Sequence, residues 1–133
     1  LAIIELCGWI ELTMDNIVER FANKHLKTQP FKESFKSLKM NNYGFDYKKN
    51  FRRMLSQTVG LHNTEKLETK LNKSGQIDIL DAILKNLKKL RDDAAHTYID
   101  ATKTYQAPSA TKAQLEQIYP ILKEFSKEVN KLK

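Results

Sequence analysis

Residues 76–101 read QIDILDAILKNLKKLRDDAAHTYIDA and carry a strong helical pattern. Apolar positions recur alternately every four and three residues and predict one helix over the whole stretch, with a stripe formed by Leu80, Leu84, Leu87, Arg91, Ala94 and Tyr98. Arg91 therefore stands where the pattern calls for a leucine. Because a guanidinium is costly to bury without a partner, we expect this face to meet a cleft, a partner chain or an anion at Arg91.

Two more segments show a helical seam. The first covers residues 3–25, with Ile3, Cys7, Ile10, Met14, Ile17 and Phe21 on one face. The other is the C-terminal segment, which carries Leu115, Ile118, Leu122, Phe125, Val129 and Leu132 on one face. Both seams predict long helices that bury one side.

The middle of the chain is less regular. A further helix is expected over residues 45–59, with Gly60 as its end. Residues 31–40 are expected to form a short helix, and residues 64–72 are ambiguous between two helical turns and a loop. The sequence thus predicts an all-α fold, a helical bundle of four main helices or of five.

The composition indicates a single domain over residues 1–133. The chain is 41% hydrophobic with four Gly and three Pro, too few turn residues for a sandwich or barrel of many strands. It lacks an initiator Met, which is compatible with a domain excised from a longer chain. The lone Cys7 lies on the apolar seam, where core packing is expected, and agrees with a reducing cytoplasm. Glu5 and Glu11 interrupt the apolar start, so neither a membrane span nor a signal peptide is expected.

The net charge is +7 and suits an anionic partner such as RNA, DNA or a membrane surface, although lysine-rich helical domains also carry such charge for solubility alone. Two basic runs are candidates for RNA backbone contacts: Lys85, Lys88 and Lys89 in one, and Lys48, Lys49, Arg52 and Arg53 in the other. Tyr43, Tyr47 and Tyr105 are candidates for base stacking. The alternative is a solvated helix surface with buried aromatic side chains.

Residues 91–98, RDDAAHTY, place several reactive groups within about two helical turns. On a regular helix Arg91 and Tyr98 share a face, whereas His96 points about 140° away from Arg91. Asp92 precedes His96 by four residues and could hold one imidazole nitrogen. A solvated polar face is the alternative interpretation.

Arg91, His96 and Tyr98, spaced as Arg-x4-His-x-Tyr with Asp92 directly after the arginine, resemble the signature of HEPN domains (higher eukaryotes and prokaryotes nucleotide-binding). The motif lies late in a helical chain of the family's usual size, before one further amphipathic segment. Specific residues match only between Arg91 and Tyr98, whereas the rest of the chain matches in its helical plan.

The resemblance implies a metal-independent endoribonuclease that needs no cofactor and forms a composite site as a homodimer. His96 would act as general base or acid in the attack of an RNA 2′-OH on the adjacent phosphate, which yields 2′,3′-cyclic phosphate and 5′-OH ends. Arg91 would hold the phosphate and stabilise its developing charge, Asp92 would orient Arg91 or His96, and Tyr98 would position the RNA.

The resemblance further implies a toxin-antitoxin or phage-defence role. A partner antitoxin, such as a minimal nucleotidyltransferase, would make Tyr98 a candidate for inactivating nucleotide addition. A resident metal is not expected, because His25, His62 and His96 are scattered and no HxxxH or CxxC pattern occurs. Two other functions stay open: a non-catalytic module that binds RNA, nucleotides or protein, and a structural bundle in which Arg91 pairs with an internal carboxylate.

Overall fold

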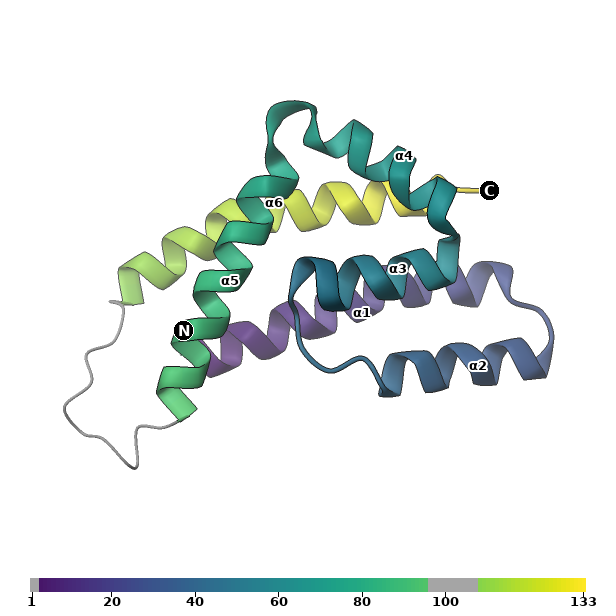
Figure 1. Cartoon of the computed structure of the whole chain (residues 1–133), viewed down its shortest axis with the longest axis horizontal. Helices are drawn as coiled ribbons and strands as arrows, with labels where there is room; N and C mark the ends of the chain where they lie inside the picture. Colours follow the sequence, from purple (N-terminus) through teal and green to yellow (C-terminus); the bar gives the residue numbers. More distant parts are fainter. Residues whose placement is uncertain (1–2, 96–107) are drawn as a thin grey trace.

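The computed structural model describes residues 3–95 and 108–133 (Figure 1). These residues contain six α-helices: α1 (Ile3–His25), α2 (Gln29–Met40), α3 (Arg52–Val59), α4 (Leu61–Leu71), α5 (Gln76–Ala95) and α6 (Pro108–Asn130). A π-helical turn, η1 (Tyr47–Phe51), leads directly into α3, and a 3-10 turn, η2 (Asn72–Ser74), follows α4. No strand occurs in the described ranges, so the all-α prediction is confirmed.

The helices pack around one hydrophobic core. α1 packs against α6, α5, α3 and α2, while α4 packs against α3 and α6 (Figure 1). The predicted seam of α1 is buried at Cys7, Ile10, Met14 and Ile17. The stripes of α5 and α6 are buried at Leu80, Leu84, Leu87, Ile118, Leu122, Phe125 and Val129. The apolar spacing therefore identified the buried faces of the three longest helices correctly.

The helix count exceeds the predicted four or five. The difference arises at α4, which forms a full helix where the sequence was ambiguous. Its buried face is narrow, with Thr64, Leu67 and Leu71, and the rest of its surface is polar. Gly60 ends α3 as predicted and also begins α4, and its φ of 94° lies in the region that glycine adopts without a steric cost.

In residues 3–95 and 108–133, no helix has the length and apolar character that crossing a membrane requires.

The C-terminal half of α5 and the N-terminal half of α1 lie near each other, since the Cys7 thiol contacts the Leu87 carbonyl at 3.9 Å. This contact places Arg91, one turn beyond Leu87, beside the start of α1.

Candidate functional site

Arg91 lies over the ring of a buried phenylalanine. Its guanidinium carbon is 4.9 Å from the centroid of the Phe45 ring, which is the distance of a cation–π interaction. The Phe45 side chain is only 2% exposed, whereas the Arg91 side chain is 31% exposed. The structure therefore resolves the unexpected arginine on the apolar stripe: its charged group lies at the edge of the core, with an aromatic ring beneath it.

The loop that carries Phe45 is held by side chains from two elements. The backbone N–H of Gly44 donates to Glu11 Oε1 on α1 at 3.1 Å. Asn50 Nδ2 donates to the Tyr43 carbonyl at 2.6 Å, and Asn50 Oδ1 accepts from the backbone N–H of Asp46 at 3.0 Å. Phe45 is thus flanked on both sides by fixed backbone.

Gly44 is required in this loop for two reasons. Its φ is +105°, a conformation that residues with a side chain rarely adopt. A Cβ at this position would also lie 2.9 Å from Asn50 Oδ1, which is too close. The loop geometry therefore depends on the pair formed by Gly44 and Asn50.

Asp92 lies beside Arg91 and forms only a long ion pair with it at the protein surface. The distance from Arg91 Nη2 to Asp92 Oδ1 is 3.5 Å, and the Asp92 side chain is 53% exposed. Such a long, exposed ion pair contributes little stability. Within the part of the chain that the structure describes, the ion pair of Arg91 with Asp92 therefore involves an exposed carboxylate, not the buried one that the purely structural interpretation requires.

Cys7 forms part of the wall behind this site. Burial raises the pKa of the Cys7 thiol to about 11; the charge of Arg91 acts in the opposite direction, and those of Asp92 and Glu11 raise the pKa further. The thiol is 1% exposed and stays protonated near neutral pH. Cys7 is therefore a core residue, as its place on the seam predicted.

The remaining residues of the motif, His96 and Tyr98, lie outside the described residues, as does Tyr105. The structure thus places Arg91 and Asp92 at the site, and the contribution of His96 and Tyr98 stays a prediction. Of the other tyrosines considered for base stacking, Tyr47 is 1% exposed and is not available, whereas Tyr43 is 79% exposed.

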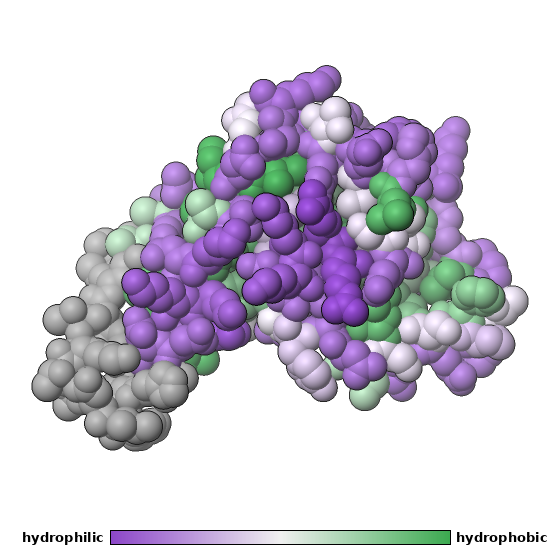
Figure 2. Space-filling view, in the orientation of Figure 1, coloured by the Kyte–Doolittle hydropathy of each residue, from purple (hydrophilic) through white to green (hydrophobic). Residues whose placement is uncertain are grey.

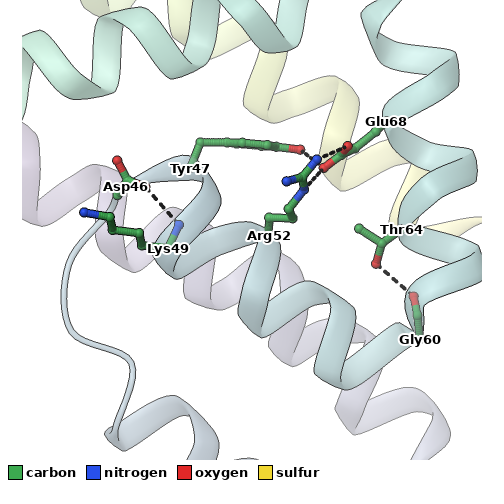
Figure 3. Close-up of polar contacts among 7 residues, drawn as sticks. All are labelled: Asp46, Tyr47, Lys49, Arg52, Gly60, Thr64 and Glu68. Carbon is green, nitrogen blue, oxygen red and sulfur yellow. Dashed lines mark hydrogen bonds and ion pairs between the residues drawn. The ribbon is translucent and has the colours of Figure 1, made fainter.

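The predicted basic residues fall into two groups. Lys88 and Lys89 are exposed on α5, and Arg53 is exposed on α3. Arg52 instead forms an ion pair with Glu68 on α4, with Nε 2.6 Å from Oε1 and Nη2 2.9 Å from Oε2 (Figure 3). In the view of Figure 2, hydrophilic side chains cover the middle of the molecule and hydrophobic ones form smaller patches.

Tyr47 completes the group around Glu68 by donating its hydroxyl to Glu68 Oε1 at 2.9 Å (Figure 3). Burial and the neighbouring Glu68 charge raise the pKa of Tyr47. Burial alone would raise the pKa of Glu68, but the hydrogen bonds from Arg52 and Tyr47 and the Arg52 charge outweigh it and lower that pKa. The cluster links η1 and α3 to α4 and is internally satisfied.

Sequence reasoning did not find Phe45, Glu11 or Asn50 as residues of this site. Phe45 precedes Arg91 by 46 positions, and the sequence predicted it as the first residue of the helix expected over residues 45–59, whereas it lies in the loop before η1. In the described ranges, no group of three His, Cys, Asp or Glu side chains is placed to hold a metal ion.

Comparison with known proteins identifies a family for this chain. A family model described as RiboL-PSP-HEPN matches residues 1–132, nearly the whole chain. Neither the curated proteins nor the solved structures contain a significant match. The match extends the resemblance of the motif to the full helical plan.

Proposed function

The chain belongs to the RiboL-PSP-HEPN family, a family of HEPN-type domains, and on this basis we propose that it is a metal-independent endoribonuclease. Membership supports a nucleotide-binding or ribonuclease-type module. The observation that carries the finer proposal is Arg91: its guanidinium lies over Phe45 and is partly exposed, and in the sequence His96 follows Arg91 by five residues.

In the proposed reaction His96 removes the proton from an RNA 2′-OH. The 2′ oxygen then bonds to the adjacent phosphorus, the bond from phosphorus to the 5′ oxygen breaks, and the leaving oxygen takes up a proton. Arg91 donates hydrogen bonds to the phosphate as negative charge builds up on its oxygens. The products are a 2′,3′-cyclic phosphate and a 5′-OH.

Three further parts of the proposal concern the surroundings of this site. Lys88 and Lys89 guide the RNA backbone because both are exposed on the helix that carries Arg91, and Arg53 is a further candidate contact. Asp92 orients Arg91 or His96, and Tyr98 positions the RNA. The active form is a homodimer, in which a second copy of Arg91 and His96 completes a composite groove.

The biological setting that we propose is toxin-antitoxin or phage defence in the cytoplasm. A toxin of this kind requires a silencing partner, and a nucleotidyltransferase antitoxin that modifies Tyr98 fits the motif. The mass of the purified protein tests this part directly, because a nucleotide adduct on Tyr98 adds a defined mass that Tyr98→Phe cannot acquire.

The reaction is tested by incubating purified protein with mixed RNA in EDTA, beside His96→Ala prepared in the same way. We expect new 2′,3′-cyclic phosphate and 5′-OH ends with the wild type alone. Intact RNA with an unmodified wild-type protein would contradict the proposal. If that protein still bound RNA tightly and in a salt-sensitive manner, the non-catalytic binding module would be the better description.

A further inference from the structure

We propose that Phe45 is a positioning residue for Arg91: its ring fixes the guanidinium at the site without neutralising it. This inference rests on the proposed function, because it concerns how Arg91 is presented to a phosphate. It starts from a contrast between two arginines of the same chain, Arg91 and Arg52.

Arg52 shows the usual way of fixing a guanidinium. Glu68 accepts hydrogen bonds from its Nε and its Nη2, so the carboxylate compensates the positive charge and occupies two donor groups. An arginine held in this way offers little to an incoming phosphate. Its role is to join α3 to α4.

Arg91 is fixed by different chemistry. The π face of Phe45 attracts the cation, yet it carries no formal charge and accepts no conventional hydrogen bond. The exposed carboxylate of Asp92, 3.5 Å away, is a weak competitor for the N–H groups. With respect to residues 3–95 and 108–133, Arg91 thus keeps its charge and most of its donors for an anionic ligand.

The Phe45 ring, which forms the platform beneath Arg91, is held rigidly. Phe45 is 2% exposed, and the backbone on either side of it is bound to Glu11 and Asn50. A free arginine side chain loses much of its rotamer entropy when it is ordered. Because the ring confines Arg91 before RNA arrives, part of that loss is incurred on folding rather than on reaching the transition state.

The test compares Phe45→Leu with Phe125→Leu. Phe125 is equally buried, at 0% exposed, and its aromatic neighbours are Tyr47 and Phe51, so it provides a matched loss of core volume away from the Arg91 platform. Both variants should lose thermal stability. The first measurement is the 15N–1H spectrum of the arginine Nε–H groups, in which the signal that disappears in Arg91→Lys is assigned to Arg91.

We expect the Arg91 signal of the wild type and of Phe125→Leu to show the upfield ring-current shift of a group above an aromatic face, and Phe45→Leu to lose that shift. In RNA cleavage, kcat of Phe45→Leu should fall about 2- to 30-fold, the factor that corresponds to the range of cation–π energies, with a smaller change in KM. Phe125→Leu should stay within about twofold of the wild type at a temperature where both variants are folded. In an Arg91→Ala background, Phe45→Leu should have no further effect on cleavage.

Two results would overturn the inference: an Arg91 signal that is unchanged in Phe45→Leu, or a loss of kcat that is equal in Phe45→Leu and Phe125→Leu. Failure of the proposed function gives a different result. In that case the wild type cleaves no RNA, and the inference is judged on affinity for a 2′-O-methyl oligonucleotide. A drop in affinity that is specific to Phe45→Leu would support the positioning role, and equal affinities would reject it.

Discussion

Arg52 and Glu68 form a two-point ion pair across the junction of α3 and α4, with nitrogen to oxygen distances of 2.6 and 2.9 Å. Arg53, which follows Arg52 in the sequence, is exposed. The two adjacent arginines, which appear equivalent in the sequence, therefore have different roles: Arg52 stabilises the fold, and Arg53 is available to a partner.

This difference predicts unequal effects of two alanine substitutions on stability. Arg52→Ala leaves the Glu68 carboxylate, whose side chain is 20% exposed, without its cation, and should lower the free energy of unfolding by about 1–2 kcal/mol. Arg53→Ala should change it by less than about 0.5 kcal/mol. Urea denaturation at pH 7 measures both, and equal values would contradict the assignment.

The sequence predicted the long elements well for a physical reason. In α1, α5 and α6 one apolar face packs against the core. Apolar residues therefore recur in the sequence at the period of an α-helix, and this spacing predicts the helix. The sequence of α4 was ambiguous because only three of its residues are buried, and one of them, Thr64, is polar. The contacts of Arg91 with Phe45 and of Arg52 with Glu68 join different elements, and spacing along one helix carries no information about such pairs.

A second prediction concerns Gly44 and the loop beneath Arg91. Gly44→Ala should destabilise the protein more than Gly60→Ala, although both glycines have a positive φ, because only at Gly44 would the new Cβ meet another atom, Asn50 Oδ1 at 2.9 Å. We expect roughly 1 kcal/mol for Gly60→Ala and a clearly larger loss for Gly44→Ala. Thermal denaturation of both variants measures the difference, and a larger loss at Gly60 would contradict the loop geometry.

Asp15 gives a prediction about pH. Burial and the charges of Glu11 and Glu19 raise its pKa from 3.8 to about 6, although Lys39 opposes them. Because the pKa of the folded state is the higher one, the stability linked to Asp15 is complete below pH 3.8 and is lost as the pH rises through about 6.

Asp15→Asn should therefore stabilise the protein at pH 7.5, by about 1 kcal/mol after allowance for the partial exposure of the side chain, and by almost nothing at pH 4. Glu65→Gln, at an exposed position of α4, is the control for the removal of one carboxylate. Urea denaturation at the two pH values measures the effect. A stabilisation of equal size at both would show that Asp15 has an ordinary pKa.

Salt dependence tests the role of the lysines on α5. If Lys88 and Lys89 each contact one phosphate, Lys88→Ala and Lys89→Ala should each reduce the slope of log Kobs against log salt by about 0.7 for single-stranded RNA. Lys24→Ala, an exposed lysine near the far end of α1, should leave the slope unchanged. A 2′-O-methyl oligonucleotide keeps the ligand intact during the titration. Equal slopes in all three variants would place the RNA elsewhere.

The central claim, that Arg91 stabilises the transition state of attack by an RNA 2′-OH, is tested most directly with an oligonucleotide that contains one ribose among deoxyribose residues. In EDTA we expect the wild type to cut only on the 3′ side of that ribose and to leave a 2′,3′-cyclic phosphate, identified by mass. Arg91→Ala should lower kcat/KM by about 100-fold or more, and Arg91→Lys should recover little of it, since lysine lacks the forked donors. Lys24→Ala, at an exposed position near the far end of α1, should stay close to the wild type. Cleavage beside a deoxyribose, or an Arg91→Ala protein as active as Lys24→Ala, would contradict the claim.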